Sequence, residues 1–282
     1  MRSRIFHTFT TILKTNLLFG IGIVLFVGWL LIALLSPIIT PYDPIVQDLS
    51  VRFQPPSQHH WFGADKFGRD VFSRVLAGSR ISLVAGLITV VVALSIGSIY
   101  GAIAGYIGGI VDDILMRISE LIIAFPAIIL AMVIAAALGP SLYNTLFAMV
   151  IIWWPNYARV MRSMVISIKS NEYVEAANIL GASHLRIIFK EIFPNSIGPV
   201  LVMMTLDFGN AILLFSGLSF LGLGSPPPTP EWGAMVANGV ENFFYWWIGT
   251  FPGLAILSVS LSANFIGDGL RDYLDPKLRK EF

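Results

Sequence analysis

Long apolar stretches, uncharged except for Asp207, alternate with short charged segments along almost the whole chain. Each stretch exceeds the roughly 20 residues that an α-helix needs to cross about 30 Å of bilayer hydrocarbon. The stretches cover residues 17–39, 81–111, 121–158, 192–230 and 242–267. The third is too long for one helix, and Gly139, Pro140 and Ser141 in its middle predict a break into two. The pattern therefore predicts an all-α polytopic membrane protein with six transmembrane helices.

The first apolar stretch predicts an uncleaved transmembrane helix. A signal peptide has a shorter apolar core followed by a small-residue cleavage site, whereas this stretch runs on to Ser36 and Pro37. The other predicted segments follow from the position of this helix in the sequence. The predicted order is a cytoplasmic segment at 1–16, the helix at 17–39, an external loop at 40–80, and a five-helix core domain at 81–282 with a cytoplasmic loop at about 159–195 and a cytoplasmic tail.

The distribution of Lys and Arg predicts which side each segment faces. With six spans, both termini and the segments near 112–118 and 159–191 lie on one side, and they carry 13 of the 18 basic residues. The opposite side carries the other five, and its segments 139–144 and 218–246 carry none. Because basic residues accumulate in cytoplasmic loops, this bias predicts cytoplasmic N and C termini.

Composition supports a membrane protein and removes several function classes. Apolar residues make up 56% of the chain, charged residues only 12%, and the mean hydropathy is +0.77. The net charge of +1 gives no reason to expect nucleic-acid binding. The absence of cysteine excludes disulfide scaffolds, thiol catalysis, and cysteine-ligated zinc or iron–sulfur clusters.

The predicted cytoplasmic loop at 159–195 is patterned more strongly than a simple connection. Helix-forming residues lie on both sides of Gly181, and Pro194 marks the predicted boundary before the fifth span. Beyond the glycine, one apolar stripe of a helix is formed by Leu185, Ile188, Phe189 and Ile192. Such an element either docks on a cytoplasmic partner or lies on lipid or on its own bundle.

The same loop resembles the EAA loop of ABC-importer permeases. In that family Glu-Ala-Ala is followed by three residues, Gly, nine residues and Ile-x-Leu-Pro. The matching residues in this sequence are Glu175, Ala176, Ala177, Gly181 and Pro194. Two positions depart from the pattern, with Glu191 in place of Ile and Phe193 in place of Leu. The resemblance implies a coupling helix, with Leu185 beyond it, that sits in a groove of an ATP-hydrolysing subunit.

Three further segments resemble the dipeptide/oligopeptide/nickel branch of these permeases. The motif Gly-Ala-Asp-Lys-Phe-Gly-Arg-Asp at residues 63–70 is similar to the external signature of that branch, except that Ala64 replaces its Thr. Residues 220–224 and 230–233 resemble the loop after the fifth span, and residues 267–276 resemble the cytoplasmic tail. The short first external loop resembles the C-type permease, the second of the two permeases in such transporters.

This resemblance implies a type I ABC-importer permease fold in the cell membrane of a prokaryote, surrounded by membrane lipid. The implied partners are a homologous second permease, two ABC ATPase subunits that bind ATP and Mg, and an extracytoplasmic solute-binding protein. Peptide is the implied cargo, and a nickel chelate or a glutathione-like molecule is the alternative within the branch. The rival from another class is an autonomous secondary transporter. Such a carrier usually needs several intramembrane ionisable groups, and this sequence has one, Asp207.

Four charged residues are candidates for the pathway or its gate. Asp207 is the only ionisable residue well inside a predicted span, where a carboxylate is costly unless it is paired or faces a cavity. Asp207 therefore lines the pathway, bonds to another helix or to a partner, or lies nearer an interface. In the external loop, Asp65, Arg69 and Asp70 either shape the outer mouth, or pair locally while Asp70 caps a helix.

We expect no catalytic residue, cofactor or metal site in this chain. It contains no Gly-x-x-x-x-Gly-Lys-Ser/Thr loop for ATP, no His-Glu-x-x-His and no Gly-x-Ser-x-Gly. His59 and His60 are adjacent on an extended loop and would form a poor chelate, so we interpret them as a solvated pair. If transport is powered, the energy must therefore come from another subunit through a physical contact.

Overall fold

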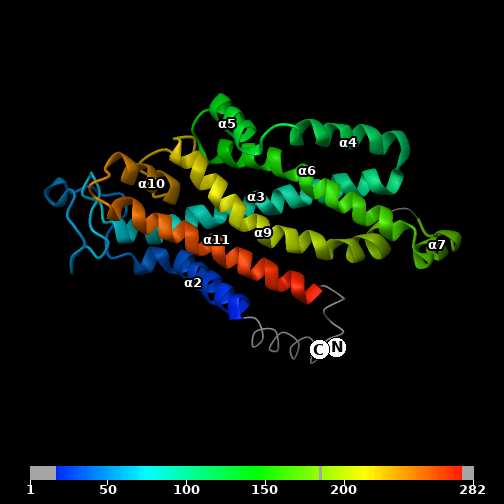
Figure 1. The fold of residues 1–282 in the computed structure, drawn as a ribbon, viewed down its shortest axis with the longest axis horizontal. Helices are drawn as coiled ribbons and strands as arrows, with labels where there is room; N and C mark the ends of the chain where they lie inside the picture. The colour runs from blue at the N-terminus through cyan, green and yellow to red at the C-terminus, as the bar shows by residue number, and fades with distance from the viewer. Residues whose placement is uncertain (1–16, 184–185, 275–282) are drawn as a thin grey trace.

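The computed structural model describes residues 17–183 and 186–274, and its long helices run along one common axis (Figure 1). Within these residues the only β-structure is an isolated bridge between Ala64 and Asp70, so the all-α fold class is confirmed. The elements are α2 (Leu17–Ile39), the 3₁₀ turn η1 (Leu49–Val51), α3 (Val71–Ile107), α4 (Gly109–Ile123), α5 (Ala127–Leu138), α6 (Leu142–Lys169), α7 (Glu172–Ile179), the π-helical η2 (Ile187–Ile192), α9 (Phe193–Phe220), α10 (Trp232–Glu241) and α11 (Trp247–Leu274).

Among the described residues, four helices are long and apolar enough to cross a membrane. They are α2, α3, the continuous helix formed by η2 and α9, and α11. The pair of α4 and α5 makes a fifth if it is counted as one span. Length and composition therefore do not confirm the predicted six spans. The difference is α6, whose 28 residues include Asn156, Arg159 and Arg162 and are less apolar than the other long helices.

Helix α3 begins at Val71, before the predicted start of the second apolar span at residue 81. Its first turn is capped by Asp70, whose Oδ2 accepts a hydrogen bond from the Ser73 amide at 2.7 Å. An aspartate here satisfies an amide that the first turn leaves without an intrahelical partner. At 37 residues α3 is about 55 Å long, which exceeds the hydrocarbon thickness of a bilayer. Part of the predicted external loop is therefore the first turns of α3.

The predicted third span, from residue 121 to the break at Gly139, contains only the end of α4 (Gly109–Ile123) and all of α5 (Ala127–Leu138), and α4 also covers the predicted connecting segment near 112–118. Helices α4 and α5 meet at 85° next to Pro126. Proline has no amide donor and disfavours helical backbone at the residue before it, so α4 ends there. The predicted break between α5 and α6 is present, and Gly139 adopts a φ of 88° at this turn.

Helix α6 packs against α3, α4, α5 and α9. Its closest approach is to α3, because Gly97 and Gly101 carry no side chain. A methyl group at these two positions would collide with the carbonyl oxygens of Trp154 and Ala158, respectively. In a membrane, where apolar burial gives little drive for helix association, such small residues allow the backbone contact that holds helices together.

The two ends of the bundle carry different structures. The loop from residue 40 to 70 and α10 lie at one end, and α7 projects at the other (Figure 1). We call these the α10 end and the α7 end. At the α10 end, Phe53 stacks on Tyr245 with ring centroids 4.0 Å apart, and Phe62 stacks on Phe251 at 3.8 Å. These contacts join the loop to the segment that begins α11.

Candidate transport site

A buried ionic network holds the loop at the α10 end against α3. Asp65 accepts hydrogen bonds from the amides of Phe67 and Arg69, at 2.8 and 3.0 Å. Its Oδ2 accepts from Nε of Arg69 at 2.7 Å and lies 3.8 Å from Nε of Arg74. The three charged side chains are at most 5% exposed. The buried carboxylate of Asp65 thus has both of its guanidinium partners within the same chain. These contacts are those of a network that stabilises the fold.

Asp70 joins the helix cap to a buried histidine. Its Oδ2 caps α3, and its Oδ1 lies 2.9 Å from Nδ1 of His60. His60 is only 8% exposed, so the interpretation of His59 and His60 as a solvated pair is wrong for His60. His59 is exposed, and the described residues hold no cluster of three or more groups suited to a metal ion. Asp65, Arg69 and Asp70 therefore pair locally and cap a helix, which was one of the two expectations for them. Their role in shaping the outer mouth of the pathway stays a prediction.

Glu231 is a buried carboxylate that sequence reasoning did not select as a site. It caps α10, with its two oxygens accepting from the amides of Gly233 and Ala234, each at 2.9 Å. The hydroxyl of Ser82 on α3 lies 3.5 Å from Oε1. Burial raises the pKa of Glu231, although these hydrogen bonds act in the opposite direction. The sequence did carry a signal for this cap, because Glu231 comes directly before the apolar Trp232 and acidic residues are favourable at the start of a helix.

Asp207 lies on α9 in the middle of the bundle, opposite α6. Its carboxylate is surrounded by Tyr157 and Trp153 of α6 and by Asn210, one turn along α9. The structure thus places the predicted intramembrane carboxylate within a group of polar side chains. Among the described residues, neither Oδ2 of Asp207 nor the Tyr157 hydroxyl has a hydrogen-bond partner, although both atoms are buried. Tyr157 nevertheless lies close enough to Asp207 for the two groups to interact electrostatically. A buried polar pair of this kind in an apolar bundle is a candidate for hydrogen bonding to another molecule.

The residues of the EAA pattern lie on α7 and the turn after it. Glu175 and Ala176 are exposed, Ala177 is half-buried, and α7 ends at Ile179. Gly181 has a φ of 78° with no atom within 4 Å of an added Cβ, so the turn uses a conformation that favours glycine. Apolar side chains project from this segment, since Ile179 is 81% and Leu180 is 85% exposed. Leu185 falls outside the described residues.

Beyond Gly181, the predicted apolar stripe is wrong in part. Ile187 and Ile192 are each 1% exposed, whereas Phe189 is 66% exposed. The cause is the π-helical turn of η2, which is wider than an α-turn and shifts the register of the stripe. Pro194 also does not separate two helices. It sits in the first turn of α9, and the helix runs without a break from Ile187 to Phe220.

The end of α6 that leads into α7 is tied to α3 and α4 by contacts that the sequence did not predict. Arg162 forms a two-point ion pair with Asp112 at the start of α4, with both N–O distances at 2.5 Å. At the last residue of α6, Nζ of Lys169 donates to the carbonyl oxygen of Tyr106 at 2.5 Å. Arg162 and Asp112 are 50 positions apart, so only the fold brings them together. Two parallel hydrogen bonds between an arginine and an aspartate restrict both the distance and the relative orientation of α6 and α4 at this point.

Comparison with known proteins places this architecture in a family. Residues 97–280 match the family described as binding-protein-dependent transport system inner membrane component. Residues 6–56 match the N-terminal TM domain of oligopeptide transport permease C. The second of these matches covers the first helix with part of its loop, and the first covers the chain from the last part of α3 onward.

Similar proteins carry names from peptide transport. The probable D,D-dipeptide transport system permease protein DdpC of Escherichia coli K12 is 45% identical over 256 residues, which cover 90% of this chain and 86% of that protein. The dipeptide transport system permease protein DppC of Alkalihalophilus pseudofirmus is 45% identical, with 95% and 88% covered. The oligopeptide transport system permease protein OppC of Bacillus subtilis is 41% identical, with the same coverage. The chain therefore belongs to the inner membrane components of binding-protein-dependent transport systems, as a C-type permease of the dipeptide/oligopeptide/nickel branch of ABC importers.

Proposed function

We propose that this chain forms half of the pathway of an ATP-driven importer of peptides, with a homologous permease forming the other half. The observation that carries the proposal is the exposed apolar surface of the segment after α7. Ile179 and Leu180, where the projecting helix α7 ends, and Phe189, near the start of the long helix formed by η2 and α9, are all more than 60% exposed. Such a surface, at the end of the bundle opposite α10, fits a groove on a partner protein. The relatives named above transport dipeptides and oligopeptides, which supports peptide as the cargo.

In this proposal the chain crosses the membrane six times. Helix α6 completes the set, and the α7 end with both termini lies in the cytoplasm. The distribution of Lys and Arg supports this orientation. Two ABC ATPase subunits, which bind ATP and Mg, dock at the α7 end. A solute-binding protein delivers cargo at the α10 end.

Closure of the ATPases moves α7, and the ties at the end of α6 pass that movement into the bundle. Since α7 follows α6 after a turn at Ser170, a push on α7 acts on the helix that holds Arg162. The ion pair from Arg162 to Asp112 carries the displacement to α4, next to two glycines with positive φ, Gly108 and Gly109. A two-state importer needs such a rigid connection between its energy source and its spans.

Asp207 supplies a hydrogen-bonding and negatively charged group inside the pathway. A peptide carries an ammonium group and amide donors, which match a carboxylate with an unsatisfied oxygen. Tyr157 and Asn210 extend the polar surface around Asp207. We expect Asp207→Asn to raise the peptide concentration needed for half-maximal uptake without preventing assembly.

Co-purification from the native membrane is the experiment that tests the proposal first. A tagged chain should arrive with a second permease and two ATPases, and should move peptide in proteoliposomes only with ATP. Leu180→Glu should remove the ATPases while leaving the permease pair intact. The matched control is Val240→Glu, since Val240 is 60% exposed on α10, at the other end of the bundle. A chain that arrives alone and transports solute without ATP would be an autonomous secondary transporter, and the importer proposal would be wrong.

A second experiment tests the connection through α6 separately. Arg162→Asp should lower peptide uptake per ATP hydrolysed, and Asp112→Arg should do the same. The double variant with both residues exchanged should recover part of the coupling, because it rebuilds an ion pair at the same place. Uptake per ATP that is equal in all four proteins would show that the ion pair only stabilises the fold.

A further inference from the structure

Two arginines on α3 have opposite surroundings. Arg74 is 3% exposed, and its Nη1 donates to the carbonyl oxygens of Pro44 and Pro228 at 2.6 and 3.3 Å. Arg80, less than two turns further along, is exposed and has no hydrogen bond or ion pair with another described residue. A guanidinium on a membrane helix is costly without a counter-charge. The two residues therefore differ in that Arg74 is satisfied within the chain and Arg80 is open to an external group.

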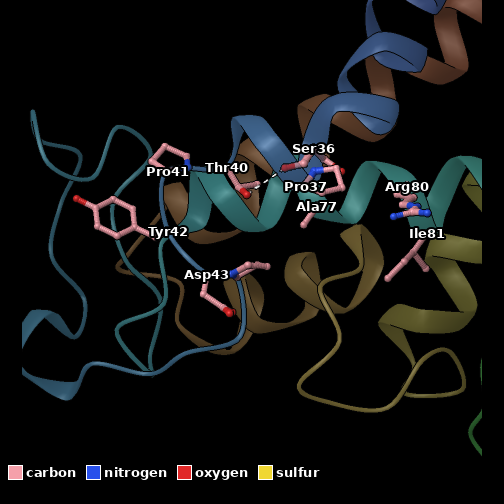
Figure 2. Close-up of a pocket in the computed structure, with 10 residues that line it drawn as sticks. Ser36, Pro37, Thr40, Pro41, Tyr42, Asp43, Ala77, Arg80 and Ile81 are labelled. Carbon is pink, nitrogen blue, oxygen red and sulfur yellow. Dashed lines mark hydrogen bonds between the residues drawn. The ribbon is translucent and has the colours of Figure 1, made fainter.

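Arg80 lines a cavity of about 450 Å³ between the end of α2 and the first turns of α3. Figure 2 shows Arg80 and Ile81 toward one end of this cavity, and Tyr42 and Asp43 toward the other. Polar groups thus lie at both ends. The volume is within the range of small-molecule sites, and it suits a small polar headgroup.

The wall of the cavity is held by hydrogen bonds. The amide of Tyr42 donates to Oγ of Ser73 at 3.1 Å, which ties the segment after α2 to α3. The hydroxyl of Thr40 donates to the carbonyl oxygen of Ser36 at 3.0 Å (Figure 2). Asp43 is fixed as well, because its Oδ1 accepts from the amides of Ile45 and Val46 at 2.8 and 3.3 Å. The cavity is therefore a preformed site.

An apolar surface continues from the cavity along the membrane-spanning part of α3. Val84, Leu87 and Val91 are 46%, 48% and 40% exposed, and they follow Arg80 at the spacing of one helix face. On α2, Leu34 and Ile38 are 74% and 81% exposed close to the same cavity. A ligand that uses both surfaces needs a charged head and long apolar chains.

We propose that this cavity binds a membrane phospholipid with a zwitterionic headgroup, its phosphate on Arg80, its ammonium group on Asp43 and its acyl chains along α3. Guanidinium groups bind phosphate oxygens through two parallel hydrogen bonds. The carboxylate of Asp43 supplies the opposite charge at the other end of the cavity, so it favours an ammonium-bearing headgroup over an anionic one. A bound lipid here anchors the junction of α2 and α3.

Native mass spectrometry of the transporter, extracted from its membrane with its partners, tests the proposal. Wild-type protein should retain a phosphatidylethanolamine that Arg80→Gln loses, with occupancy falling about tenfold for one charge-assisted contact. Arg52→Gln is the matched control, because Arg52 is an exposed arginine in the loop before α3 and lies outside the cavity. Asp43→Asn should shift the retained lipid from phosphatidylethanolamine toward phosphatidylglycerol.

Ala77→Phe keeps the test decisive if Arg80→Gln does not insert. It fills the cavity and leaves Arg80 in place, and it should also lose the lipid. Equal lipid retention in wild type, Arg80→Gln and Ala77→Phe would overturn the proposal. So would loss of the second permease instead of lipid, since a protein would then occupy this face. Glycerophosphoethanolamine, added as a soluble headgroup without chains, should not displace the lipid; displacement would show that the site takes the free zwitterion.

Discussion

The α10 end and the α7 end of the bundle differ in how their side chains are satisfied. At the α10 end, Asp65, Arg69, Asp70 and Glu231 are all at most 4% exposed, and each has a partner within the chain. At the α7 end, Ile179 and Leu180 are 81% and 85% exposed where α7 ends, on an element that projects from the bundle. The α10 end also exposes large apolar side chains, Phe243 and Phe244 at 80% and 92%, so the two ends differ chiefly in the buried charged network. A charged network that is complete in one chain contributes to that chain's stability, whereas an apolar surface without a cover contributes to an interface.

Because of this difference, substitutions at the two ends should have different effects. Substitutions in the network at the α10 end should lower the free energy of unfolding. Substitutions on the surface at the α7 end should leave it unchanged and affect transport. Each of the following predictions tests one side of that contrast, beginning with the largest expected effect.

Asp65→Ala should lower the free energy of unfolding by about 3–5 kcal/mol, because it leaves Arg69 and Arg74 buried without a counter-charge. Denaturant unfolding of the detergent-solubilised chain measures this change. The control is Glu241→Ala, which removes an exposed ion pair with Lys66 and should cost no more than about 1 kcal/mol. Equal losses in the two variants would contradict a stabilising network at the α10 end.

Gly181→Pro should reduce ATP-driven uptake at least about tenfold, equivalent to some 1.4 kcal/mol of coupling. Proline holds φ near −65°, whereas this position has a φ of 78°, so the turn after α7 must change shape. Uptake in proteoliposomes and the thermal midpoint are measured together, and the midpoint should stay within about 2 °C of wild type. Gly217→Ala, at a position with no close neighbour, is the control. Normal uptake in Gly181→Pro would remove the coupling role of this turn.

Asp70→Ala should cost about 1–2 kcal/mol of stability, because it removes the cap of α3 and the partner of His60. Asp70→Asn keeps an oxygen that can accept from the Ser73 amide, so its loss should be smaller. Thermal unfolding of both variants gives the comparison. Equal losses in Asp70→Asn and Asp70→Ala would show that the charge, and not the cap, dominates at this position.

The stability of the chain should fall slightly as the pH rises above 4.5, the ordinary pKa of a glutamate. Burial raises the pKa of Glu231 in the folded state, so the folded chain holds this proton at pH values where the unfolded chain has released it. The slope of unfolding free energy against pH is then negative between the two pKa values. Glu231→Gln has no such proton and should show a flatter profile. An unchanged slope in that variant would assign the pH dependence to other groups.

Family and fold class followed from local features of the sequence. The apolar runs predicted helices that the structure contains, and Gly139 marked a real break, because helix length and glycine or proline turns depend on neighbouring residues. The EAA pattern marked the segment around Glu175 and Gly181 as a predicted coupling loop. Asp70 was correctly foreseen as a possible cap, since a cap involves residues only three positions apart.

The remaining features depend on residues that are distant in sequence. His60 reaches Asp70 only after the loop folds back, and Arg162 meets Asp112 only when α6 packs beside α4. The apolar stripe was predicted with α-helical spacing, and the π-helical turn of η2 changed it. Local patterns carry no information on such pairings, because each requires the long helices to be placed first.

The sequence alone determined that this protein is a helical membrane permease and predicted which loop faces a partner, because hydropathy and short motifs are properties of contiguous residues. Only the tertiary structure decided which charges are used within the chain and which stay open. Arg74 and Arg80 lie on the same helix, yet one is buried against Asp65 and the other lines a cavity. The rotation of α3 against the loop and α2 sets that difference, and rotation is a result of packing.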